Sequence, residues 1–553
     1  MAKPDTLRTS GKLSIAVAAS RVLGLVREVL FAALFGVGAI ADAYQVAFRI
    51  PNLLRDLFAE GALSSAFVPT FLAELLGKDK GKDQSDAQGE PVPDREAAYR
   101  LGNLTLAGVL LTTGTLSLLG IVFAEQVVEL MSGGFDGGTL SAEEAQAKLE
   151  LAVLLTRVMM PLLTIISVSA VWMGMLNAQR HFMAPAWAPA MFNVASITVG
   201  AGLMVVRPDD GVGIWLWSLG TLGAGVVQAC VQLPALLRLG YRPIPRIRGL
   251  LSHPGIRRIL RLMAPAVVGL AAVQINIFVN TRFAASLGDG PIAQLSYAFR
   301  IFYLPVGVFS VALATVTTTR VSEDAAKKDL GALAAATAEG ASGVWMLMSA
   351  STVGLVVLAE PVVRVLYFSF SASEATATAM VLQAYVLGLL PYGLVKIFAP
   401  GFYGLDRPRI PLMASFAAVA VNIVFNALTY ERFGAPGLAL GTTIGAIVNI
   451  SILRLSFRKV AGPLPGLSGK QLAALVLANL VLGAVVIAAN LGVGLVIEGL
   501  SRGVWFARLA GLGLVIPLGF LAYVAVLRGF GYPGAALLWA LPGKLWRRIR
   551  GAR

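Results

Sequence analysis

The sequence predicts an all-α polytopic membrane protein. We expect 14 transmembrane helices, built as two six-helix lobes in a parallel pseudo-twofold repeat plus two extra C-terminal helices. Composition, the spacing of apolar segments and an internal repeat carry this prediction. Of 553 residues, 57% are hydrophobic and only 14% are charged, and mean hydropathy is +0.76. A soluble protein of this size needs more polar surface, so an ordinary cytosolic enzyme is excluded.

Apolar segments long enough to cross a bilayer follow one another along the chain, separated by short polar loops. The second is too long for a straight span, and Pro51 and Pro69 are expected to bend it. The predicted spans are 11–36, 39–76, 100–131, 149–177, 184–206, 213–237, 258–287, 291–319, 333–359, 375–402, 411–429, 435–456, 471–492 and 505–527.

The distribution of positive charge orients these spans. The chain has 45 Lys and Arg against 30 Asp and Glu, a net charge of +15. With the N-terminus in the cytoplasm, 31 cations fall in inner segments and 6 in outer ones, among them Lys148. This bias follows the positive-inside rule and places both termini in the cytoplasm. It explains the net charge without nucleic acid as a partner.

An internal repeat divides the chain. Residues 31–33 (Phe-Ala-Ala) recur at 283–285, and residues 47–50 (Ala-Phe-Arg-Ile) recur at 298–301. Chance identity is the alternative, and the shared arginine weighs against it. Because six spans separate the copies, the lobes have the same orientation and face each other, as in transporters. We expect an N-lobe (1–240), a C-lobe (241–460), helices 13 and 14 (461–530) and a basic cytoplasmic tail (531–553).

Eight cations remain inside the predicted spans, where each costs about 2.5–3.5 kcal/mol if it faces lipid. One interpretation is that arginines pair with acids to join helices, as Arg27 and Glu28 could. We favour a cavity, because the repeat gives Arg49 and Arg300 equivalent positions in the two lobes. Arginine suits phosphate oxygens, so the cavity predicts a phosphate-bearing anionic substrate. The eight are Arg21, Arg27, Arg49, Arg55, Arg157, Arg282, Arg300 and Lys396.

Three stretches carry a resemblance to a known family. They are residues 20–28 (SRVLGLVRE), residues 41–43 (ADA) and residues 48–69, which begin FRIPNLLR. Together they resemble the opening of the MurJ (MviN) lipid II flippases, in the multidrug/oligosaccharidyl-lipid/polysaccharide exporter superfamily. Residues 297–300 (YAFR), followed by Pro305, resemble that family's eighth-helix motif.

The resemblance implies a transporter rather than an enzyme, located in the bacterial inner membrane. Its expected partner is lipid II, the undecaprenyl-pyrophosphate-linked peptidoglycan precursor, moved to the outer leaflet by alternating access for cell wall and cell shape. The last two helices are expected to form a groove for the lipid tail. With the repeat, the resemblance gives these candidate substrate-binding residues: Arg21, Arg27, Arg49, Arg55, Arg300, Asp42, Asn52 and Glu60.

The chain departs from the family pattern at three points. Phe299 stands where many members carry an acid, which leaves the charge partner of Arg300 open, and Glu28 replaces a common Asp. Some members bind sodium, but the nearest candidates here, Asn280, Asn422 and Asn426, are all neutral. We expect no cofactor or metal, coupling either to the membrane potential or to a monovalent ion, membrane lipids as neighbours, and a monomer.

Rival functions remain open on the sequence alone. Another exporter of the same superfamily could carry lipid-linked oligosaccharides or drugs, although a drug exporter should have an acidic cavity. A membrane enzyme would need an acid cluster or a His or Ser base at a membrane face, and the loops show no such spacing. A purely structural helix bundle would not need eight cations within its spans.

Overall fold

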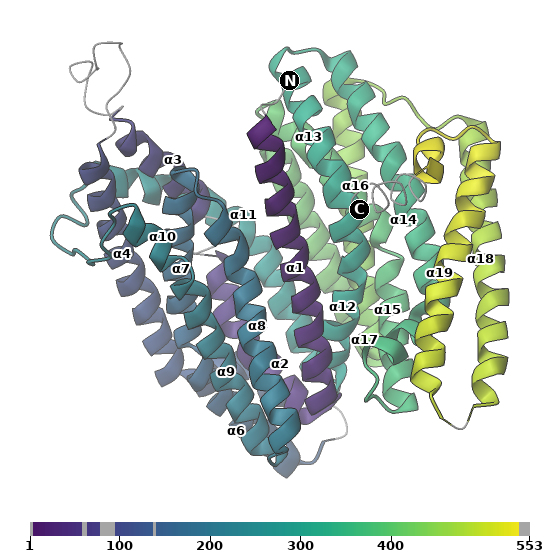
Figure 1. Ribbon diagram of the computed structural model, residues 1–553, viewed down its shortest axis with the longest axis horizontal. Helices are drawn as coiled ribbons and strands as arrows, with labels where there is room; N and C mark the ends of the chain where they lie inside the picture. Colours follow the sequence, from purple (N-terminus) through teal and green to yellow (C-terminus); the bar gives the residue numbers. More distant parts are fainter. Residues whose placement is uncertain (1–3, 58–62, 78–93, 136–139, 501, 541–553) are drawn as a thin grey trace. The chain divides into compact units, whose positions relative to one another are not determined.

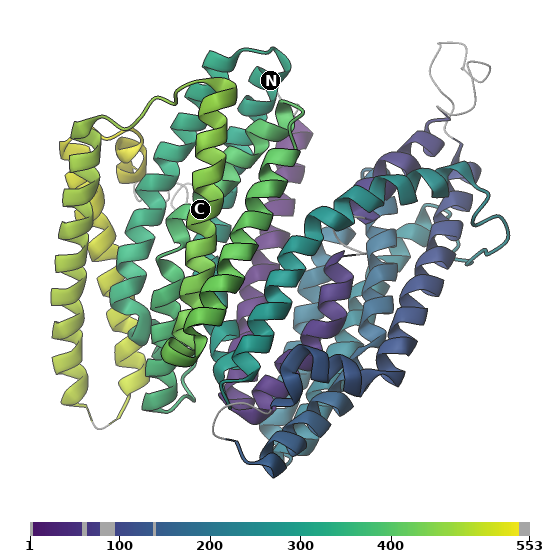
Figure 2. The same cartoon turned by 180° about the vertical axis from the view of Figure 1, so that it is seen from behind.

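The computed structural model describes residues 4–57, 63–77, 94–135, 140–500 and 502–540. Within these ranges every regular element is helical, which confirms the predicted all-α class. The chain divides into two compact units, Met1–Ala293 and Gln294–Arg553. Each unit is a bundle of long helices (Figures 1 and 2).

The first unit contains the helices of the N-terminal half of the chain. Its elements are α1 (Pro4–Phe35), α2 (Ala39–Arg55), α3 (Ser64–Leu75), α4 (Arg95–Val122), α5 (Ala124–Ser132), the short η2 (Gly133–Phe135), α6 (Ala142–Met159), α7 (Pro161–Ala178), α8 (Met183–Val206), α9 (Asp210–Cys230), α10 (Leu233–Arg238) and α11 (Pro254–Ala285).

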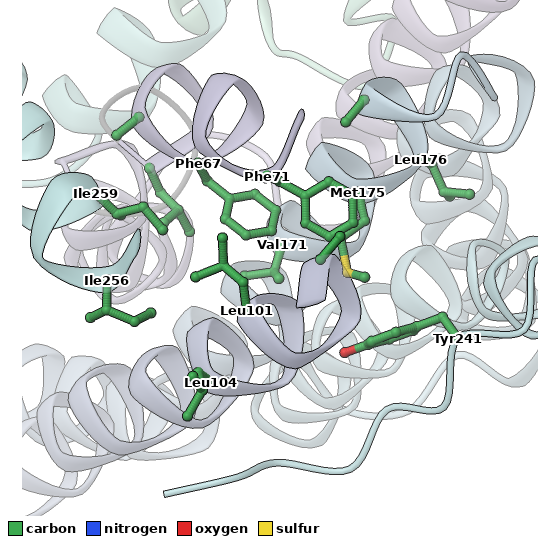
Figure 3. Close-up of a cluster of buried hydrophobic side chains, with 14 of the residues drawn as sticks. Phe67, Phe71, Leu101, Leu104, Val171, Met175, Leu176, Tyr241, Ile256 and Ile259 are labelled. Atoms are coloured by element: carbon green, nitrogen blue, oxygen red, sulfur yellow. The ribbon is translucent and has the colours of Figure 1, made fainter. Parts of the chain in front are cut away.

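An apolar core joins α3, α4, α7 and the start of α11. Phe67 and Phe71 of α3 are fully buried against Leu101 of α4 and Met175 of α7 (Figure 3). A side chain added at Gly102 would come within 2.8 Å of the Met175 methyl carbon, so the glycine allows α4 and α7 to approach closely.

The second unit contains the remaining helices. It begins within α12 (Pro291–Pro305), whose residues up to Ala293 belong to the first unit. The helices that follow are η3 (Val306–Ser310), α13 (Val311–Ala326), α14 (Leu330–Leu366), α15 (Ala372–Val386), α16 (Leu389–Gly404), α17 (Arg409–Ala461), α18 (Gly469–Glu498) and α19 (Val504–Gly529). The last two pack side by side and both contact α14, at one edge of this unit (Figures 1 and 2).

Local sequence signals start several helices. α6, α15 and α18 each begin with a capping box, in which a serine and the residue three positions later satisfy each other's backbone N–H groups. The pairs are Ser141–Glu144, Ser371–Glu374 and Ser468–Gln471. α7 begins with Pro161, which lacks the N–H that a helix start leaves unpaired.

Several predicted spans are interrupted in the structure. The span 100–131 divides into α4 and α5 at Phe123, and 375–402 divides into α15 and α16. Pro51 and Pro69, expected to bend the second span, lie inside α2 and α3; α2 continues to Arg55 and α3 begins at Ser64. α17 covers two predicted spans, and its backbone leaves the helical region at Gly434, with φ 58°.

Eleven helical stretches of the described chain are long and apolar enough to cross a membrane. α11 packs against α3, α4 and α5, and its Ile256 and Ile259 are buried in the first unit's core. The predicted lobe boundaries at residues 240 and 460 stay predictions.

Candidate functional site

Arg27 on α1 is largely enclosed. Its guanidinium lies 3.5 Å from the Glu28 carboxylate, and the two side chains are 14% and 6% exposed. The guanidinium also lies 5.4 Å from the centre of the Phe192 ring on α8, a cation–π contact. The Arg27–Glu28 pair therefore forms within α1, and the Phe192 contact is the one that links Arg27 to α8, the helix along which α1 packs. Arg21, two turns earlier on α1, is exposed.

Asp42 on α2 is completely buried and its carboxylate is fully engaged. The backbone N–H groups of Gly290 and Ala293 donate to it, each at 2.8 Å. Lys148 donates from Nζ at 3.1 Å. The Asp42 carboxylate thus caps the N-terminus of α12, and a helix N-terminus favours negative charge. In this arrangement its carboxylate contacts protein groups, and its expected contact with substrate stays a prediction.

Lys148 was predicted to lie in an outer loop just before a span; the structure places it inside a helix instead, and its side of the membrane stays a prediction. It lies in α6, and its side chain is 1% exposed. Nζ also donates to Asp289 at 2.7 Å and to the Gly288 carbonyl at 3.2 Å, and it lies 4.6 Å from the centre of the Phe135 ring. The capping box at Ser141 could have revealed that Lys148 lies in a helix, because it starts α6 two turns before Lys148.

Arg49 connects α2 to α11. Its Nη1 donates to the Thr281 hydroxyl, which is buried. One residue further, Arg282 reaches the end of α5, where Nη1 lies 3.4 Å from the Ser132 carbonyl. Two of the eight intramembrane cations therefore hold α11 against other helices of the first unit. A cation at the C-terminal end of a helix is stabilising, since the last carbonyl groups are unpaired.

The contact between Arg282 and α5 gives a testable prediction. Gly133 has φ +67°, and an added Cβ would lie 1.9 Å from the Arg282 Cζ atom. We expect Gly133→Ala to lower the thermal unfolding temperature of the purified protein more than Gly134→Ala does. Gly134 has φ +73° but open space around it, so both variants carry about 1–2 kcal/mol of backbone strain and only one displaces Arg282. Equal shifts would contradict a stabilising role for Arg282.

At the end of α2, Arg55 pairs with its neighbour. Its Nε and Nη2 donate to one oxygen of Asp56 at 3.1 and 2.8 Å, and the side chains are 24% and 36% exposed. Asn52 donates to the Phe48 carbonyl one turn earlier at 2.8 Å. Glu60 lies outside the described residues.

Arg300 lies in α12 of the second unit and is exposed. Phe299, which occupies the position of the family's common acid, packs among aromatic rings, with centroids 5.4 Å from Phe302 and 5.5 Å from Tyr385. This position therefore supplies an aromatic contact in place of a carboxylate. Lys396 lies 5.9 Å from the centre of the Tyr392 ring, next to the same aromatic group.

The three neutral candidates for an ion site pair along their own helices. Asn280 donates to Asn276 at 2.8 Å on α11, and Asn426 donates to Asn422 at 3.3 Å on α17. Asn280 belongs to the first unit, and the other two are fully buried in the second. Among the described residues no group of three His, Cys, Asp or Glu side chains could hold a metal ion. Ion binding at these asparagines stays a prediction.

Comparisons with known proteins agree with the sequence motifs. A family model described as lipid II flippase MurJ matches residues 31–508. The lipid II flippase MurJ of Burkholderia cenocepacia is 34% identical over 453 residues, which cover 81% of this chain and 83% of that protein. A Vibrio cholerae protein named "Probable lipid II flippase MurJ" is 34% identical over 436 residues, 78% of this chain and 79% of its own.

Solved structures give the same result for the fold. A structure of the lipid II flippase MurJ in an inward closed conformation aligns with TM-score 0.73 and 25% identity, covering 94% of this chain and 98% of that one. An inward-facing multidrug resistance transporter of the MATE family, in the MOP superfamily, aligns with TM-score 0.64 and 17% identity over 80% of this chain and 94% of its own. The second likeness concerns the fold alone.

Proposed function

The chain belongs to the MurJ lipid II flippase family, and from this premise we propose how it works. It moves lipid II from the inner to the outer leaflet of the bacterial cytoplasmic membrane by alternating access. Its intramembrane arginines hold the pyrophosphate while the hydrophilic headgroup crosses. During this crossing the polyprenyl tail stays in the lipid beside α18 and α19.

Four arginines gathered on α1 and α2 carry this proposal: Arg21, Arg27, Arg49 and Arg55. Asp42 on α2 is already engaged by Lys148 and two backbone N–H groups. An arginine in a membrane segment is costly unless it has polar partners, and guanidinium groups match the two phosphates of a pyrophosphate. A substrate anion would share these arginines with the protein groups that they already contact.

The proposed topology has fourteen spans with both termini in the cytoplasm. The eleven candidate spans count α17 once, although it breaks at Gly434, and they omit α1 and the α2–α3 pair. If α17 counts as two spans, and α1 and the α2–α3 pair count as one span each, the eleven become the predicted fourteen. The inner excess of Lys and Arg supports this orientation. The basic tail from residue 541 onward lies outside the described residues.

The energy source follows from the charge of the substrate. An anion that moves outward is favoured by a negative-inside potential, by about 2.3 kcal/mol per charge per 100 mV. We propose coupling to this potential, or to a monovalent ion, without a bound cofactor and with a monomer as the working unit.

The nearest rival is a drug exporter of the same superfamily, and the four arginines of α1 and α2 argue against it. The positive charge of these arginines repels an organic cation, whereas it attracts an anionic pyrophosphate.

Complementation tests the function directly. A bacterium depleted of its own flippase should resume growth when it expresses this chain, and lipid II should again be accessible from the outside of the membrane. A strain with the empty vector should accumulate lipid II in the inner leaflet. If the expressed protein inserts but outward lipid II is not restored, the substrate assignment is wrong.

A further inference from the structure

An open pocket of about 450 Å³ lies at the start of α11, on a different helix from the arginines of α1 and α2. It is lined by Ser252, Pro254, Arg257, Arg258, Arg261 and Leu262. In the topology proposed above, this end of α11 is cytoplasmic. The three arginines fall within five residues of one another, and all three are exposed.

The helix turns that carry the arginines of this pocket are anchored by buried residues on their opposite face. Ile256 and Ile259 are 6% and 3% exposed and lie in the first unit's core, pointing toward Leu101 and Phe67 (Figure 3). Nε of Arg257 donates to the Leu251 carbonyl at 3.0 Å. These contacts fix the backbone that carries the arginines, so their charges gather at one place.

The charged residues that line this pocket are all positive. No acidic residue lines it, and the sequence has none between Asp210 and Asp289. Three guanidinium groups carry ten or more N–H donors and suit a ligand with several phosphate oxygens. Two linked phosphates fit this set better than the single phosphate of a phospholipid. Orientation by the positive-inside rule requires positive charge, but it does not require a pocket.

An exposed apolar strip continues from the pocket along α11. Arg257, Arg261, Ala264, Val268 and Ile275 fall within an arc of about 60° at 100° per residue. Val268 and Ile275 are 54% and 46% exposed. A phosphate site followed by one narrow apolar strip matches a lipid with a charged head and a single tail, and it does not match a soluble anion.

We propose that this pocket is a docking site for the pyrophosphate of an inner-leaflet polyprenyl lipid, whose tail lies along the apolar strip of α11. The substrate binds here before it reaches the arginines of α1 and α2. This inference rests on the proposed function, and it adds a second phosphate site on a different helix. Its role is to raise the local concentration of substrate at the inner leaflet.

Crosslinking tests the site. The probe is a polyprenyl pyrophosphate with a photoreactive group in its first isoprene unit, added to the full chain in neutral phosphatidylcholine vesicles. We expect labelling of peptides that contain Leu262 or Val268, and at least a tenfold loss in the triple variant Arg257→Gln, Arg258→Gln, Arg261→Gln. The control is Arg242→Gln, Arg246→Gln, Arg248→Gln, which removes the same charge from exposed positions of the preceding loop. Equal losses in the two triple variants would overturn the docking site.

Two further measurements separate the alternatives. If phosphatidylglycerol at equal concentration displaces the probe, the pocket binds bulk anionic phospholipid and the proposed occupant is wrong. In translocation assays the pocket variant should need about tenfold more lipid II for half-maximal rate, whereas the control variant should not. A wild-type protein that labels but never translocates lipid II would refute the proposed function. A wild-type protein that translocates without labelling would refute only the docking site.

Discussion

Replacing Arg300 by alanine should reduce lipid II translocation to a level that cannot support growth, while the protein still inserts into the membrane. A charge-assisted hydrogen bond to phosphate contributes about 1.5–3 kcal/mol, and each 1.36 kcal/mol is tenfold in rate. The loss of one such contact in the rate-limiting step therefore lowers the rate about 10- to 150-fold. Arg55→Ala should have a similar effect, since Arg55 is one of the four arginines proposed to hold the pyrophosphate. Growth of a flippase-depleted strain, with membrane levels of each variant, measures both.

The matched control is Arg320→Ala on α13. Arg320 is 60% exposed and pairs with the exposed Glu339 at 3.0 Å. The substitution therefore removes one arginine and one ion pair outside the proposed site. We expect this strain to grow normally. Normal growth of a strain that depends only on the Arg300→Ala protein would remove Arg300 from the substrate site.

Lys148→Met should produce the largest loss of stability of the single changes proposed here. Lys148 is the buried partner of Asp42, and Asp289 is its second partner with a side chain 38% exposed. Removing one member of a buried ion pair costs about 3–5 kcal/mol, because it leaves an uncompensated charge. Because Asp42 joins α2 to the start of α12, we expect a lower unfolding temperature and lower membrane levels. Thermal unfolding of the purified protein measures the effect.

A double variant isolates the ion pair from simple loss of packing. Asp42→Asn together with Lys148→Met removes both charges. The double variant should therefore lose less stability than the sum of the losses in the two single variants. Arg320→Ala serves again as the exposed ion pair, with little expected change. A Lys148→Met protein that unfolds at the wild-type temperature would show that this network does not stabilise the fold.

Hydropathy and charge predict much of this fold, because a bilayer leaves few options for the backbone. Long apolar runs must be helical there, and the predicted spans coincide with described helices to within a few residues in most cases. The arginine-rich opening of the chain also identifies the family, as the match over residues 31–508 confirms. Phe123 divides α4 from α5 at a position that average hydropathy does not mark, whereas the break at Gly434 falls between the predicted spans 411–429 and 435–456.

The polar contacts could not be predicted, because they join residues far apart in the sequence. Lys148 and Asp42 are 106 positions apart, and the hydropathy pattern around Lys148 is that of a loop border. The same holds for Arg282, which reaches a carbonyl of α5 over 150 positions. Of the eight cations placed in the membrane, Arg27, Arg49, Arg55 and Arg282 have described contacts with other protein groups. A substrate that binds them must therefore exchange or share these contacts.

Translocation by the purified protein is the most direct test of lipid II transport through the arginines. Proteoliposomes with fluorescent lipid II are treated with a membrane-impermeant quencher, and the fraction bleached reports movement between leaflets. We predict that the wild-type protein moves lipid II between leaflets, that the Arg55→Ala, Arg300→Ala double variant does not, and that Arg320→Ala behaves as wild type. Equal bleaching by the wild-type and double-variant proteins, or bleaching by the wild type that stops at the outer-leaflet fraction, would contradict this function.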